Sequence, residues 1–167
     1  MYDNVMHKFK WGGLEKPGLY LDENTMRMCK SFRRALFADL AIALINENKT
    51  DNAIQVLDKC IEVLPEKNVP YDYSVHEIVT LYLSLGENEK AKKIATSLFD
   101  YYATNVDWMF RLKPLQRETV LPFLNENMQF FMDLIKAFYQ NDNVFTQPYM
   151  EKFKQYNEQY QTIFKKE

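Results

Sequence analysis

The sequence predicts an all-helical fold. Only four glycines and six prolines occur in 167 residues, so few positions interrupt long helices. Apolar residues recur at spacings of three and four through most of the chain, and this is the period of one helix face. Hydrophobic residues make up 47% of the chain and charged residues 26%, which is enough to bury a core. We therefore expect a single helical domain over residues 1–167.

Residues 1–24 are expected to form an irregular arm. Gly12-Gly13 and Pro17-Gly18 are turn-forming combinations, and they leave little room for a regular helix. Asp22 can accept hydrogen bonds from the free backbone N–H groups at a helix start, so we place the first helix from Thr25. Four side chains of the arm are expected to fix it to the helical body: Trp11, Leu14, Leu19 and Tyr20.

The first helix hairpin is expected over residues 25–65. Apolar positions at helical spacing run from Met28 to Leu44, and the polar stretch Asn46–Lys49 ends this helix. A second helix begins at Thr50 or Asp51, both of which are good N-cap residues, and Pro65 stops it.

The second hairpin is expected over residues 71–103. Its first helix carries apolar positions between Val75 and Tyr82, a turn follows at Gly86, and its second helix carries apolar positions from Ala91 to Phe99.

The pattern changes after Tyr102. We expect a connection over 105–114 and then two capping helices over 115–165. Pro122 is expected to start or kink the first of these helices, and Pro148 to start the last. A stack of hairpins leaves one face of its last unit uncovered, so an atypical terminal hairpin is typical of such folds.

The hairpins resemble the tetratricopeptide repeat. Counted from Arg34, eight positions carry the large or small residue types of that repeat: Phe37, Leu40, Ala41, Leu44, Ala53, Leu57, Cys60 and Pro65. The small residues let two helices approach, and the large ones fill the space between hairpins. The second repeat matches less fully, because Val79 stands at a small position. The resemblance implies tetratricopeptide-like antiparallel helix hairpins in a short right-handed solenoid, with an N-terminal irregular arm and a C-terminal capping hairpin.

A second resemblance concerns the parent protein. The segments Lys8–Gly12, Tyr20–Asn24 and Arg27-Met28 resemble the C-terminal soluble region of a bacterial multi-pass membrane protein family of unknown function. The N-terminal part of that family is similar to protein O-mannosyltransferases, and further similarity covers Ala53–Pro65 and Asn68–Tyr71. The resemblance implies an accessory, glycosyltransferase-associated tail on the periplasmic face of the inner membrane. The resemblance assigns no catalytic residue to this chain.

Charge and cysteine usage limit the partners. The net charge of −2 gives no broad positive field, so we expect no nucleic-acid partner. The longest apolar run, Ala35–Ile45, is too short to cross a membrane, and the first residues lack the apolar core of a signal peptide. Cys29 and Cys60 lie far apart without a metal-ligand spacing. We therefore expect no metal site, no cofactor and no membrane insertion by these residues.

Two groups of polar side chains are candidates for a partner surface. Asp22, Glu23 and Arg27 lie close together at the first helix start, beside Tyr20, and such a cluster can bind a carbohydrate or a peptide terminus. The alternative is a helix N-cap with a local ion pair, which the helix dipole favours in any case. Arg33 and Arg34 are expected to be exposed on the inner face of the first helices.

Three aromatic residues complete the candidate surface: Trp11, Tyr71 and Tyr73. Exposed rings can stack on sugars or anchor a peptide, whereas packed rings would only seal the arm and the links between hairpins. Three functions follow as hypotheses. The first is a non-catalytic domain that binds a protein or peptide, the alternative is a carbohydrate-binding module that uses exposed aromatics, and the third is a small free-standing enzyme. No residue pair indicates catalysis, so the chain by itself is not expected to be an enzyme.

Overall fold

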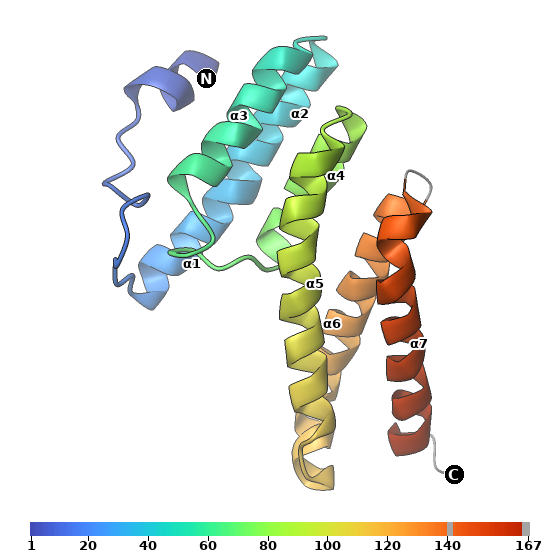
Figure 1. The fold of residues 1–167 in the computed structure, drawn as a ribbon. Coiled ribbons are helices and arrows are strands. Elements are labelled where there is room, and N and C mark those ends of the chain that lie inside the picture. Colours follow the sequence, from blue (N-terminus) through green and yellow to red (C-terminus); the bar gives the residue numbers. More distant parts are fainter. Residues whose placement is uncertain (140–141, 165–167) are drawn as a thin grey trace. The chain divides into compact units, whose positions relative to one another are not determined.

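A computed structural model describes residues 1–139 and 142–164 (Figure 1). All regular structure in these ranges is helical, without a strand, and the predicted all-helical class is confirmed. None of the helices described is both long and apolar enough to span a membrane. The chain divides into two compact units, Met1–Ile94 and Ala95–Glu167, and each is described separately. The single domain expected from the sequence stays a prediction.

The arm of the first unit is irregular from Phe9 to Leu21, but it begins with a π-helical turn, η1 (Asn4–Lys8), that the sequence did not predict. Hydrogen bonds hold the arm in place. The Asn68 side-chain amide donates to the carbonyl oxygens of Leu14 at 2.6 Å and Lys16 at 2.7 Å. These backbone groups have no partner in a helix, so a side-chain donor satisfies them.

One continuous helical stretch follows the arm: α1 (Glu23–Phe32), the π-helical segment η2 (Arg33–Ala38) and α2 (Asp39–Asn46). It starts where predicted to within two residues, because the Asp22 carboxylate accepts from the N–H groups of Asn24 at 2.9 Å and Thr25 at 3.1 Å. The π-helical segment was not predicted. One extra residue per turn there changes which side chains face the core.

Helix α3 (Thr50–Val63) packs on α2, so the first predicted hairpin is present. The turn between them contains Asn48 at φ 58°, a left-handed conformation that ends the first helix. Six of the eight residues assigned to repeat positions are buried: Phe37, Ala41, Leu44, Ala53, Leu57 and Cys60. Leu40 and Pro65 are half-buried.

A link over 64–72 leads to the 3-10 turn η3 (Tyr73–Val75) and helix α4 (His76–Ser84). Gly86, at φ 79°, makes the turn into α5 (Asn88–Phe110). We expected this helix to end near residue 103, and that expectation is wrong. Its buried face continues through Val106 and Met109, so helical packing extends to Phe110 and the connection shrinks to 111–113.

The second unit contains the rest of α5, α6 (Pro114–Tyr139) and α7 (Asn143–Phe164). The final helix was expected to start at Pro148, but it starts at Asn143, because the Asp142 carboxylate accepts from the Phe145 N–H at 2.9 Å. Pro148 and Pro122 both lie inside helices. The last expected helix residue, Lys165, lies outside the described residues.

Candidate functional site

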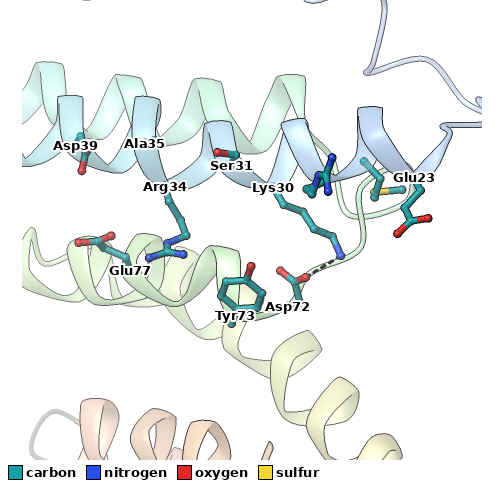
Figure 2. Close-up of a pocket in the computed structure, with 11 residues that line it drawn as sticks. Glu23, Lys30, Ser31, Arg34, Ala35, Asp39, Asp72, Tyr73 and Glu77 are labelled. Carbon is teal, nitrogen blue, oxygen red and sulfur yellow. Dashed lines mark ion pairs between the residues drawn. The ribbon is translucent and has the colours of Figure 1, made fainter. Parts of the chain in front are cut away.

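A groove of about 690 Å³ lies within the first unit, between the α1–η2–α2 stretch and the segment formed by η3 and α4 (Figure 2). We call it the α1–α4 groove. One wall is formed by Glu23, Met26, Arg27, Lys30, Ser31, Arg34, Ala35 and Asp39, and the other by Asp72, Tyr73 and Glu77.

Helix periodicity brings the charged residues of the first wall together. Glu23, Arg27, Lys30 and Arg34 follow one another at spacings of four, three and four, so they share one face of the helix. That face is solvated and carries both signs of charge.

An ion pair joins the two walls at the centre of the groove. The Lys30 ammonium lies 2.7 Å from the Asp72 carboxylate, whose side chain is only 8% exposed (Figure 2). Asp72 also accepts from the Ser74 N–H at 2.9 Å and thereby starts η3. Burial alone would raise the pKa of Asp72, but the hydrogen bonds from Lys30 and Ser74 outweigh it and hold that pKa below its ordinary value.

Arg34 extends from the helical wall toward the opposite wall. Its guanidinium carbon lies 5.6 Å from the centre of the Tyr73 ring, within the range of a cation–π contact. Figure 2 shows Glu77 on one side of this guanidinium and Tyr73 on the other. Arg34 is exposed, and in the described part of the chain it forms no ion pair. Its charge is therefore accessible to a ligand.

Arg33 behaves differently from its neighbour, and the expectation that it is exposed is wrong. Its side chain is completely buried. The guanidinium donates to the carbonyl oxygens of Leu64 at 3.0 Å, Pro70 at 3.1 Å and Val69. We call this arrangement the Arg33 clamp. Because the link has an irregular backbone, its carbonyls lack helix partners and a buried cation supplies the missing donors.

The clamp also sets the position of the second wall. Arg33 donates to the Ser74 hydroxyl at 3.3 Å and lies with its guanidinium carbon 5.1 Å from the centre of the Tyr71 ring. Burial lowers the pKa of Arg33 and raises that of Tyr71 to about 12. Tyr71, a predicted surface residue, is therefore a buried part of the wall support.

The remaining predicted site residues lie outside the groove. Tyr20 is 93% exposed, and Asp22 is engaged as the N-cap of α1. Trp11 is half-buried, with its ring centre 5.1 Å from that of Phe37 and 6.4 Å from that of Phe32. The groove therefore contains four of the nine predicted residues: Glu23, Arg27, Arg34 and Tyr73.

Sequence reasoning missed Lys30, Asp39, Asp72 and Glu77. The regular spacing of Glu23, Arg27, Lys30 and Arg34 was a signal that could have identified Lys30. No comparable signal exists for Asp72 and Glu77, because their place opposite α1 depends on the path of the irregular link.

The groove offers ion pairing and hydrogen bonding. In the ranges 1–139 and 142–164, no cluster of three His, Cys, Asp or Glu side chains is arranged to hold a metal ion. Cys29 and Cys60 are buried thiols without a disulfide, and burial raises the pKa of Cys60 to about 12. A thiol with so high a pKa is a poor nucleophile at neutral pH.

Comparisons of the chain with known protein families, with curated proteins and with solved structures find no match.

Proposed function

We propose that this chain is a non-catalytic interaction or accessory domain that holds a segment of a partner protein in the α1–α4 groove. The observation that carries the proposal is the juxtaposition of accessible charges of both signs across a groove whose helical wall includes two small residues. Ser31 and Ala35 lie one helical turn apart and are exposed. Their short side chains leave room for the backbone of a bound segment.

The charges indicate what such a segment contains. Lys30 and Asp72 already neutralise each other, whereas Arg34 is accessible and can receive a carboxylate through a bidentate pair. The exposed ring of Tyr73 beside it supplies an apolar contact. We therefore propose a peptide segment with an acidic group next to an apolar residue.

We further propose that the helices form a short tetratricopeptide-like right-handed solenoid. Burial of six repeat-position residues supports this arrangement, since the repeat uses those positions for packing between helices. The α1–α4 groove would then be part of the inner face of the first two hairpins.

The resemblance of the arm and the first helix start supports a proposal for location. We propose that the chain is the periplasmic tail of a larger, glycosyltransferase-like membrane protein. An antibody raised against this chain tests it by fractionation of the source cells. A band much larger than 20.0 kDa in the membrane fraction is the expected result, and a free band of that size in the soluble fraction would contradict the proposal.

Peptide binding can be tested without a known partner. Random peptides displayed on phage are selected on the whole chain, and the tightest binder is labelled and followed by fluorescence anisotropy. We expect Arg34→Ala and Tyr73→Ala each to weaken binding about tenfold. Arg111→Ala changes an exposed arginine outside the groove and should leave the affinity within about twofold. Binding that is unaffected by both groove substitutions would contradict the proposal.

A further inference from the structure

A second groove, of about 410 Å³, lies within the second unit between α6 and α7. We call it the α6–α7 groove. Four of its lining residues carry carboxamides: Asn125, Gln129, Asn157 and Gln161. From these residues we infer that the α6–α7 groove is a binding site for a neutral carbohydrate chain.

The absence of charge in the lining defines the ligand class. The other lining residues are Met128, Met132, Phe153 and Tyr160, so no lining side chain of the described groove is ionised at neutral pH. A charged ligand would give up hydration here without gaining an opposite charge. A neutral polar ligand avoids that cost.

The carboxamides have unused hydrogen-bonding capacity. Each offers one acceptor oxygen and two donor hydrogens. Gln129 donates to Asp133 at 2.8 Å, but the side chains of Asn125, Asn157 and Gln161 make no hydrogen bond to another described residue. A sugar hydroxyl is both a donor and an acceptor, so neighbouring hydroxyls of a sugar ring match such amides.

The apolar part of the lining suits a flat ligand. The Phe153 ring is stacked on Phe131 with centres 6.1 Å apart and planes at 20°, so its orientation is fixed. Met128 lines the groove and is only 8% exposed. A peptide that binds through a side-chain anchor gains most from an enclosed pocket, whereas this groove is open to solvent. A sugar ring needs only a fixed apolar surface for its C–H face.

The dimensions are consistent with a short chain of sugar units. The stretch of α6 from Asn125 to Met132 covers about 10 Å at the helical rise per residue. One amide stands at the start of this stretch, one stands near its middle, and two stand on the facing helix. We therefore expect the α6–α7 groove to contact a sugar chain along the length of the groove, through several weak contacts.

Methionine methyl NMR of the whole chain tests the proposal. Met128 and Met132 report on the α6–α7 groove, and Met26 reports on the α1–α4 groove. The probes are hexasaccharides of glucose, mannose and N-acetylglucosamine, with a sulfated oligosaccharide and an uncharged glycine–serine–asparagine peptide for comparison. We expect at least one neutral sugar to shift the Met128 and Met132 signals saturably at millimolar concentration, while Met26 stays unchanged.

A pair of matched variants localises the binding. Replacing Asn157 and Gln161 together by alanine should weaken the sugar about tenfold, since two hydrogen bonds are lost. Replacing Gln155 and Gln159, which are exposed on the same helix outside the groove, should leave the affinity unchanged. Circular dichroism checks that both variants keep their helices. The proposal is overturned if no neutral sugar shifts these signals, if only the peptide or the sulfated sugar does, or if both double variants bind sugar equally well.

Discussion

The α1–α4 groove and the α6–α7 groove differ in how the chain builds them. The first joins a helical wall to a segment that arrives through an irregular link, and a buried arginine holds that link in place. The second lies between two helices that follow each other in sequence, and its lining residue Phe153 packs against the buried ring of Phe131. Seven of the eleven residues that line the first are charged, and none of the eight that line the second is.

This difference shows two ways to hold the walls of a groove on helices. In the first unit the Arg33 clamp holds the link that carries one wall, and most of the lining side chains are charged. In the second unit aromatic rings pack beside the groove, and the polar side chains of the lining are neutral. Substitutions can remove the Arg33 clamp and the ring packing separately. In each case another residue of the same helical stretch serves as the control.

The largest effect is expected from Phe131→Ala. Phe131 is completely buried, and its ring centre lies 4.9 Å from that of Phe99, so the loss should lower the free energy of unfolding by about 3–5 kcal/mol. Urea denaturation measures this change. Phe123→Ala, at a 62% exposed position of the same helix, should change it by less than about 0.5 kcal/mol. Equal effects from the two substitutions would contradict the role given to ring packing.

We expect Arg33→Ala to lower the free energy of unfolding by a smaller amount, about 2–4 kcal/mol. The substitution leaves the carbonyls of the link without donors, and each unsatisfied buried group costs about 1–3 kcal/mol. Arg34→Ala is the matched control, because Arg34 is exposed and its loss should cost less than about 0.5 kcal/mol. Thermal unfolding compares the two. If both variants are equally stable, the clamp does not support the groove wall.

The smallest expected effect is the contribution of Asp72 to the loss of folding stability at acidic pH. Because the pKa of Asp72 is lowered in the folded chain, its ionised form stabilises the fold above its unfolded pKa, and that stability is lost as the pH falls through the folded pKa. Below about pH 4, where an unfolded aspartate begins to bind protons, we expect Asp72 to contribute to the decline in the free energy of unfolding, by less than either substitution above. Asp72→Asn should show a correspondingly smaller decline in urea titrations. An identical decline in both proteins would argue against the Lys30–Asp72 pair.

Much of the fold could be predicted because helical periodicity is local. The spacing of apolar residues predicted the helices and the first hairpin, and Asp22 predicted the first helix start. The end of α5 was misjudged, because Val106 and Met109 continue its buried face through a stretch of polar and aromatic residues. The start of α7 differs from the prediction because the Asp142 cap begins the helix at Asn143, and Pro148 lies inside it as its sixth residue.

The site was less predictable for a physical reason. Glu23, Arg27 and Arg34 share a helix face, so a sequence pattern suffices to group them. Arg33 and Arg34 look equivalent in sequence, yet one is buried and the other is exposed. What separates them is the path of a link some thirty residues later, whose carbonyls Arg33 satisfies, and helical periodicity does not encode that path.

The central claim is that the α1–α4 groove is the surface that binds a protein partner. Methionine methyl NMR of the whole chain with the peptide selected by display tests it most directly. We predict that the Met26 signal shifts as the peptide saturates the chain, while the Met128 and Met132 signals stay in place. In Arg34→Ala the same Met26 shift should require about tenfold more peptide. A bound peptide that leaves Met26 unchanged would contradict the claim.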